Sequence, residues 1–260
     1  MKILVVNSSG RTNGNTERLL NVLEKQLLKI ADKQQITLDI IHMRLAKEDI
    51  QICIGCRDCL DKGNCILKDD VSKIQKLVLS CDTLILASPV YLEDVNGIMK
   101  NWLDRMAFNS HRPAFYGKCA IAISTSGSGS SNHSLNTLKN AMTAFGFHVL
   151  PVNKFRMGAY MKTDDIEMQY HSKLLHIATN LIFSIQNGRS QKPSLFSLVS
   201  FNIQQKYYRF SDRAGTLDRG YWQEKSWLEP KVHFYIPTKC NALKLLSARV
   251  LGVLIAKIFI

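Results

Sequence analysis

An apolar run followed at once by small polar residues opens this chain and limits what it can fold into. Residues 2–6 are rich in β-branched and apolar side chains, and the run is long enough for one buried strand. The ten residues that follow, 7–16, contain no large apolar side chain. Leucines at helical spacing then begin at Leu19. The sequence therefore predicts a strand, a polar loop and a helix, in that order.

A loop of this composition between a strand and a helix suits a phosphate group. The first N–H groups of a helix have no partner within it, and the helix dipole favours an anion there. Ser9, Asn15 and Thr16 add side-chain donors, and Arg11 can bind phosphate oxygens through two N–H groups. The alternative is that residues 13–16 only cap the helix, since the loop matches neither the dinucleotide-binding nor the P-loop motif.

Five strand patterns alternate with helical patterns along the chain. This alternation favours right-handed βαβ units and an open parallel sheet. The third strand is almost wholly apolar, as expected for a strand buried on both faces. After the opening strand, the predicted strands are residues 35–41, 82–87, 118–124 and 147–152, and the predicted helices are residues 71–80 with Asp70 as cap, 95–106, 135–145 and 164–186.

Polar loops follow three of these strands, at residues 8–15, 88–91 and 125–132. In a parallel sheet all three loops lie at one edge, where ligands bind. The loop at 88–91 ends its strand and offers an aromatic face to a flat ring, and the loop at 125–132 offers backbone N–H donors and close approach. Gly and Ser also make ordinary turns, but three such loops at one edge favour a ligand.

The chain is basic, and the imbalance is uneven. Its net charge is +13, and residues 151–260 carry 16 Lys/Arg against 7 Asp/Glu. A basic balance favours an anionic cofactor, a membrane surface or nucleic acid as partner, and the scattered charges argue against nucleic acid. Met1 runs straight into the first strand without a signal peptide pattern, so we expect a cytoplasmic protein with reduced cysteines.

Two loop motifs together make the sequence resemble the flavodoxin-like NAD(P)H-dependent reductases, a group that includes NADPH-dependent FMN reductases and iron–sulfur flavoproteins. The resemblance covers about residues 1–187 and has one departure, Gly10 in place of the usual proline. The matching residues are Ser9, Arg11, Gly14, Asn15 and Thr16 in the first loop, Ser88, Pro89, Val90 and Tyr91 in the second, and the pair Asp104 and Arg105 in the next helix.

This resemblance implies a flavodoxin-like, doubly wound, five-stranded parallel sheet in the order 2-1-3-4-5 with helices on both faces. It implies FMN as cofactor, NAD(P)H as electron donor, and a quinone, a flavin or another small-molecule or protein acceptor. No catalytic acid or base is expected, because the flavin carries the redox chemistry. The implied cofactor-binding residues are Ser9, Arg11, Asn13, Asn15 and Thr16 for the phosphate, and Pro89, Val90, Tyr91, Thr125, Ser126 and Gly127 for the ring.

Four cysteines within thirteen residues form a second candidate site: Cys53, Cys56, Cys59 and Cys65. Four thiolates can hold a [4Fe–4S] cluster or tetrahedral zinc, and the compact spacing favours the cluster. The resemblance maps these cysteines onto the cluster ligands of iron–sulfur flavoproteins. The alternatives are that they pack as small apolar residues or react as thiols. With a cluster, the chain could instead be an electron carrier between a ferredoxin and an acceptor. A flavodoxin-fold module without flavin is a third possibility.

Residues 188–260 exceed what such a core needs, and they predict a basic, apolar, mostly helical extension. The run 242–260 approaches the length of a membrane span, but Lys244, Arg249 and Lys257 interrupt it and make spanning unfavourable. This helix can pack on the core or on a second subunit, or it can lie on an anionic membrane. Its apolar content, together with Tyr91 at an edge loop, predicts a homo-oligomer, dimer or tetramer, whose partner subunit helps to cover the flavin.

Overall fold

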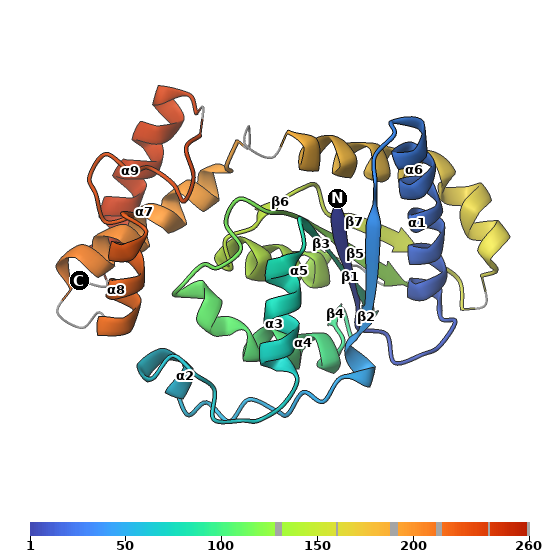
Figure 1. The fold of residues 1–260 in the computed structure, drawn as a ribbon, viewed down its shortest axis with the longest axis horizontal. Helices are drawn as coiled ribbons and strands as arrows, with labels where there is room; N and C mark the ends of the chain where they lie inside the picture. Colours follow the sequence, from blue (N-terminus) through green and yellow to red (C-terminus); the bar gives the residue numbers. More distant parts are fainter. Residues whose placement is uncertain (128–131, 160, 188–191, 212–214, 239, 259–260) are drawn as a thin grey trace.

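The computed structural model describes residues 1–127, 132–159, 161–187, 192–211, 215–238 and 240–258. A parallel sheet lies at its centre, in the order β2-β1-β3-β5-β6 (Figure 1). Two further strands lie off this path, because β7 pairs in parallel with β5 and β4 pairs antiparallel with β3. The strands are β1 (Lys2–Asn7), β2 (Asp39–Arg44), β3 (Thr83–Tyr91), β4 (Asp94–Val95), β5 (Cys119–Ser126), β6 (His148–Val149) and β7 (Asn153–Arg156).

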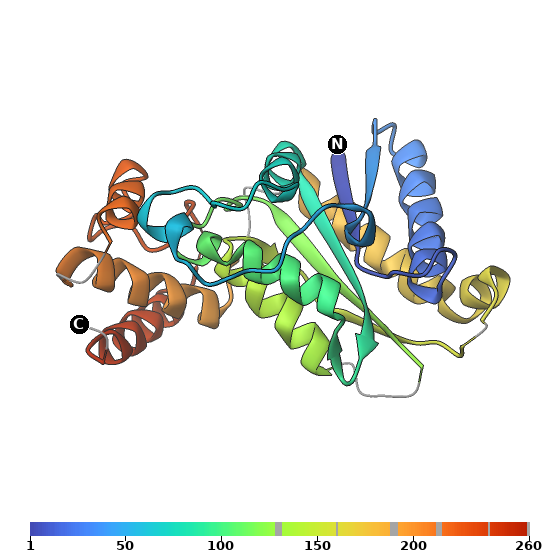
Figure 2. The same ribbon diagram turned by 90° about the horizontal axis from the view of Figure 1, so that it is seen from below.

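Helices cover both faces of the sheet (Figures 1 and 2). One face packs on α1 (Asn15–Lys33) and α6 (Thr163–Gln186), which also contact each other. The other face packs on α3 (Val71–Ser80), α4 (Gly97–Arg105) and α5 (Asn132–Ala144). Residues alternate between the two faces along β1, where Ile3 and Val5 join one core and Leu4 and Val6 the other.

The predicted doubly wound sheet is confirmed and its strand order broadly agrees, with three differences in the strands. The second strand begins at Asp39 rather than residue 35, because Gln35 adopts φ +54° and Ile36 N–H still donates to Ala31 O at 2.8 Å. The chain thus completes a turn after α1 before it extends. The predicted fifth strand, residues 147–152, contains only the two residues of β6, and β7 begins beyond it at Asn153. Pro151, which has no N–H to donate, lies between these two strands.

The third strand does not end at Ser88 as predicted but continues to Tyr91. It then turns through Leu92 and Glu93, both at positive φ (48° and 67°), and pairs with β4. The loop predicted at residues 88–91 is therefore the outer end of a strand and the start of a hairpin. Short helical segments η1 (Leu45–Lys47), α2 (Asp58–Asp61) and η2 (Ala107–Ser110) lie in the connections.

The C-terminal extension contains α7 (Leu195–Phe210), α8 (Thr216–Glu224) and α9 (Ala242–Ala256) at one end of the molecule (Figure 1). It has an aromatic core of its own, made of Phe201, Tyr208, Trp222, Trp227 and Tyr235. The predicted boundary at residues 187 and 188 falls beside residues 188–191, which lie outside the described part of the chain. Among the described residues, no helix combines the length and the apolar character needed to span a membrane.

Candidate functional site

The three polar loops meet at the carboxyl ends of β1, β3 and β5, and hydrogen bonds join them. Ser8 N–H donates to Ala87 O at 3.0 Å, which links the first loop to β3. Asn96 Nδ2 donates to Ser8 O at 2.7 Å and so connects the start of α4 to the first loop. The Thr16 and Thr125 hydroxyl oxygens lie 2.7 Å apart and link the first loop to the third. The sheet edge predicted from the sequence is therefore one connected site.

The first loop leaves the start of α1 open. Gly14 is the N-cap residue and supplies no side-chain hydrogen bond to the helix. Ser9 and Thr16 are buried at this point, whereas Arg11 is exposed. The Ser9 hydroxyl accepts from Arg11 N–H at 3.2 Å and so shapes the turn. Uncapped helix N–H groups beside buried hydroxyl groups form a donor set suited to an anion.

Two of the predicted phosphate ligands also have structural roles. Asn15 Nδ2 donates to Gly158 O at 2.7 Å, which brings the loop after β7 to the site. Asn13 has φ +56°, and its backbone N–H donates to the Glu17 carboxylate. The Glu17 carboxylate also lies 3.6 Å from Arg44 Nη1, so the negative charge of Glu17 is paired with a positive charge beside the loop.

The second and third predicted loops begin within β3 and β5, which lie side by side here, since Pro89 pairs with Thr125. Pro89 and Val90 are half-buried, and Tyr91 is 51% exposed. Thr125 and Ser126 are buried, while Gly127 is exposed and a Cβ added there would meet no atom within 4 Å. The rest of the predicted third loop, residues 128–131, lies outside the described residues.

Asn96 is a site residue that sequence reasoning missed. It is buried, it caps α4 by accepting from Met99 N–H at 3.2 Å, and it holds the Ser8 carbonyl. An asparagine just before a helical pattern predicts a cap, which could have identified the first role. The second role depends on a contact 88 positions away in the chain, which no local pattern reveals.

The four cysteines of the second candidate site lie on the segment between β2 and α3. Cys53, Cys56 and Cys65 are exposed and Cys59 is half-buried. All four line one cavity of 220 Å³. Burial, and then the nearby Cys65 and Cys53 thiols, raise the pKa of Cys59. Within the described ranges, no three His, Cys, Asp or Glu side chains are close enough to hold a single metal ion.

Glycine conformations let this segment fold back on itself. Gly55 and Gly63 adopt φ +67° and +82°, and Arg57 adopts +69°. Positive φ costs glycine little, so both glycines stand where the chain must turn sharply. Apart from the four residues of α2, the segment from Cys53 to Cys65 has no helix or strand. It is an irregular stretch, as the sequence predicts, and it lines the cavity together with residues from 104–111.

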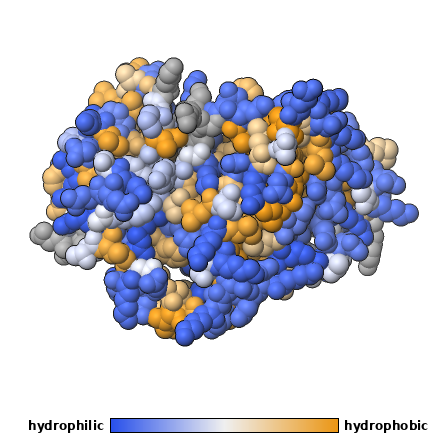
Figure 3. Space-filling model, in the orientation of Figure 1, coloured by the Kyte–Doolittle hydropathy of each residue, from blue (hydrophilic) through white to orange (hydrophobic). Residues whose placement is uncertain are grey.

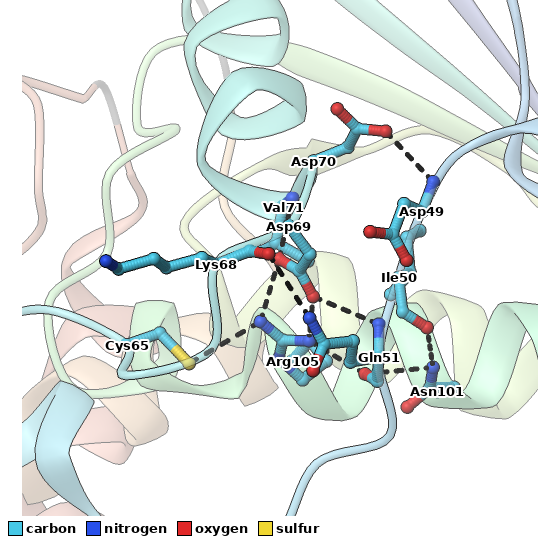
Figure 4. A network of polar contacts seen from close by, with 10 residues as sticks. All are labelled: Asp49, Ile50, Gln51, Cys65, Lys68, Asp69, Asp70, Val71, Asn101 and Arg105. Atoms are coloured by element: carbon cyan, nitrogen blue, oxygen red, sulfur yellow. Dashed lines mark hydrogen bonds and ion pairs between the residues drawn. The ribbon is translucent and has the colours of Figure 1, made fainter.

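Arg105 anchors this segment to the core (Figure 4). Its guanidinium forms a buried ion pair with Asp69 and donates to Gln51 O at 2.7 Å. It also donates to Cys65 Sγ at 3.5 Å. Burial opposes ionisation of Asp69, but hydrogen bonds from Arg105 and from backbone N–H groups hold the pKa of that carboxyl below its ordinary value.

Asp70 is the N-cap residue of α3, as the sequence predicts, but its side chain makes no hydrogen bond to the helix. Its carboxylate accepts from Asp49 N–H at 2.9 Å instead. The Asp69 carboxylate accepts from Val71 N–H at 3.2 Å, at the first residue of α3. The bounds of α3 agree with the prediction, but the adjacent aspartate makes the contact with the helix N-terminus because Arg105 draws it inward.

A model of the NADPH-dependent FMN reductase family matches residues 1–162. The chain belongs to this family. It is therefore a flavin-dependent NAD(P)H oxidoreductase whose cofactor is FMN. An iron–sulfur flavoprotein of Archaeoglobus fulgidus is 26% identical over 88% of this chain and 100% of its own length. An iron–sulfur flavoprotein of Clostridioides difficile is also 26% identical, over 86% of this chain and 99% of its own.

Solved structures support the fold of this reductase. The crystal structure of RosB with bound 8-demethyl-8-formylriboflavin-5'-phosphate aligns over 72% of this chain and 79% of its own, with a TM-score of 0.56. Its sequence identity is 15%, so the likeness concerns the flavodoxin-like fold alone.

In this FMN reductase a second arginine joins the extension to the cysteine segment. Arg112 donates to Cys59 O and forms an ion pair with the Asp218 carboxylate of α8. His111 Nδ1 lies 3.0 Å from the same carboxylate. Between these elements is a cavity of 790 Å³, lined by residues from 59–75, 105–114 and Tyr221. The sequence did not predict this contact, because its partners are 106 positions apart.

Proposed function

We propose that this reductase binds FMN at the edge formed by the ends of β1, β3 and β5, and delivers electrons from NAD(P)H to a quinone, a flavin or another acceptor. The observation that carries the proposal is the buried contact between Thr16 and Thr125 beside the uncapped start of α1. It joins the loop suited to a phosphate with the loop suited to a ring. FMN, when bound, supplies the hydride and electron chemistry.

The residues at this edge fit the FMN phosphate. The N–H groups at the start of α1 and the hydroxyls of Ser9 and Thr16 are donors, and a phosphate accepts hydrogen bonds only. Arg11 is exposed beside them and adds a positive charge. Asn13 and Asn15 complete the proposed set. Charge-assisted hydrogen bonds of this kind contribute about 1.5–3 kcal/mol each.

The ring of the flavin would lie between the second and third loops. Pro89, Val90 and Tyr91 present backbone and apolar surface from the end of β3, and Thr125 and Ser126 present backbone from the end of β5. Gly127 is exposed, and a Cβ added there would meet no atom within 4 Å, so this residue itself does not block a ring. The protein's part is to bind and orient, so we assign no side chain as acid or base.

A second function is supported by the cysteine segment, that of an electron carrier with a [4Fe–4S] cluster. Cys53, Cys56, Cys59 and Cys65 line one cavity that is larger than a single ion requires. Four thiolates are the ligand set of such a cluster. Both iron–sulfur flavoproteins named above align along nearly their full length. The cluster would add one-electron transfer to the flavin chemistry and open a route from a ferredoxin.

We also propose that a second subunit covers the flavin. Tyr91 is half exposed, and Leu92 projects fully into solvent from the tip of the β3–β4 hairpin. Leu92 has a positive φ, which is unfavourable for a leucine. An apolar side chain held in this position is suited to contact another copy of the chain. The two copies would form a dimer, alone or as part of a tetramer.

Steady-state oxidation of NADH and NADPH distinguishes these functions. Protein purified without oxygen and loaded with FMN is given either nucleotide and an artificial acceptor such as ferricyanide. The proposed reductase turns over with at least one nucleotide. Flavin-loaded protein that oxidises neither nucleotide but accepts electrons from reduced ferredoxin is a carrier instead. A protein that retains no flavin contradicts both functions.

A further inference from the structure

Helix α9 packs through its smallest residues. Its buried positions are Ala248, Gly252 and Ala256, which lie four residues apart on one side of the helix and face α7. A Cβ added to Gly252 would lie 2.5 Å from the Cβ of Asn202 in α7. Glycine is therefore required for the two helices to approach so closely.

The large apolar side chains of α9 lie on the opposite side, at the surface. Leu246, Val250 and Leu254 are 58%, 51% and 57% exposed at a spacing of four residues, and Ile258, just beyond the end of α9, is 78% exposed. A surface helix of a soluble domain normally turns its large apolar residues inward. Burying small residues and exposing large ones is instead the packing of helices surrounded by lipid.

Helix α7 extends this apolar surface. Phe201 and Tyr208 of α7 belong to the aromatic core of the extension, whereas Leu195, Phe196 and Phe210 are exposed. In Figure 1 α7 and α9 lie side by side at the end of the molecule farthest from α1, and Figure 3 shows apolar groups at the surface there. Large apolar side chains are thus exposed on both of these packed helices, which is a feature of surfaces that bind a partner.

The charge of the extension identifies that partner. Residues 188–260 carry 12 Lys/Arg against 4 Asp/Glu, a net charge of +8, and residues 241–260 carry three basic residues and no acidic one. Two of these basic side chains also make contacts within the extension. Lys244 donates to Pro193 O, and Arg249 donates to Pro230 O and lies 2.7 Å from His233 Nδ1. A second copy docked on this surface would bring like charges together, whereas an anionic surface would neutralise them.

We propose that α9, together with the exposed apolar side chains of α7, docks this protein on an anionic lipid membrane. Helix α9 has 15 residues and is thus about 22 Å long, which is shorter than the hydrocarbon core of a bilayer. It therefore lies in the plane of the interface, with its leucines in the acyl region and its basic side chains at the headgroups.

Vesicle flotation with the full-length protein tests this proposal. Phosphatidylcholine vesicles are compared with vesicles that also contain phosphatidylglycerol. The protein should bind the anionic vesicles more tightly, and salt should weaken that binding. Leu246→Glu combined with Leu254→Glu should weaken binding about tenfold or more. The matched control is Met168→Glu with Phe183→Glu, two exposed apolar residues of α6, which should bind as the wild type does.

A charge variant tests the same surface independently of the leucines. Lys257 is exposed, so Lys257→Gln should fold normally and lower affinity for anionic vesicles about fivefold, with little effect on neutral ones. Failure of the wild type to bind anionic vesicles overturns the proposal, as does equal binding by the leucine variant. The proposal is also overturned if the wild type is a dimer in sedimentation, the leucine variant is a monomer, and neither binds vesicles. That result would assign the surface to a second copy of the chain.

Discussion

Thr16 Oγ1 lies 2.7 Å from Thr125 Oγ1, in a buried contact between residues 109 positions apart in the chain. The first threonine belongs to the start of α1 and the second to the end of β5. The contact closes the sheet edge around the place proposed for FMN, so it affects both folding and cofactor binding.

Replacing Thr125 with valine keeps the shape of the side chain and removes its hydroxyl. Thr125→Val should cost about 1–3 kcal/mol of stability, because the Thr16 hydroxyl stays buried without this partner, and it should weaken FMN binding. The control is Thr83→Val, which removes a 2.7 Å hydrogen bond to Cys119 O at the other end of the sheet. Urea unfolding and FMN titration should show lost stability in both variants and lost affinity only in Thr125→Val. Equal FMN affinity in the two variants contradicts this assignment.

The buried pair of Arg105 and Asp69 predicts a pH dependence of stability. Hydrogen bonds lower the pKa of Asp69 in the folded protein, so its stabilising contribution is complete above the unfolded-state pKa and is lost as the pH falls through the lower, folded-state value. Asp69→Asn should therefore destabilise the protein by about 3–5 kcal/mol at neutral pH and by clearly less in strong acid. Urea unfolding of both proteins at the two pH values measures this. The same loss of stability in Asp69→Asn at both pH values would contradict this prediction.

The contact between Arg112 and Asp218 predicts that α8 supports the cysteine segment. In metal-free protein, Cys59 should react with iodoacetamide more slowly than the exposed Cys53 and Cys56, because it is half-buried. Asp218→Ala should free Arg112 and speed the alkylation of Cys59. Glu224→Ala is the matched control, since Glu224 pairs with Lys225 on the surface of the same helix. Mass spectrometry of the alkylated peptides decides, and an unchanged rate for Cys59 in Asp218→Ala means that α8 gives no such support.

Iron analysis tests the cysteine segment itself. Protein purified without oxygen should contain about four irons per chain. Cys59→Ser should lose the iron and keep its flavin, whereas Cys240→Ser, outside the segment, should keep both. If the wild-type protein contains no iron but a normal amount of FMN, the reductase function stands and the electron-carrier function is ruled out.

Local patterns in the sequence predicted most of the fold. The helix at 71–80 has the expected bounds, and the long helix begins one residue before the predicted 164 and ends at Gln186 as predicted, because the apolar spacing of both is regular. The second strand was placed too early because the apolar alternation that begins at Ile36 overlaps the turn that ends α1. Strand β3 continues to Tyr91 because its outer residues pair with β5 and then with β4, and pairing between strands is not visible in a single segment.

The candidate site was predictable only in part, for a similar reason. Loop composition indicated Ser9, Thr16 and Thr125, since donors at strand ends have a recognisable pattern. The link from Asn96 to Ser8 and that from Arg112 to Cys59 and Asp218 join distant positions and depend on tertiary packing. The inverted packing of α9 likewise emerges only with α7 beside it, because the sequence alone shows a helix that is apolar on most sides.

The most direct test of the flavin site is the FMN affinity of Arg11→Ala combined with Thr16→Ala, measured by titration of flavin fluorescence with apoprotein. Two charge-assisted contacts are removed, so the affinity should fall about a hundredfold or more while the circular dichroism spectrum stays that of the wild type. The control, Lys29→Ala with Thr179→Ala, removes an exposed cation and an exposed hydroxyl elsewhere and should bind FMN as the wild type does. A double variant that folds and binds FMN as tightly as the wild type would show that the phosphate does not lie at the start of α1.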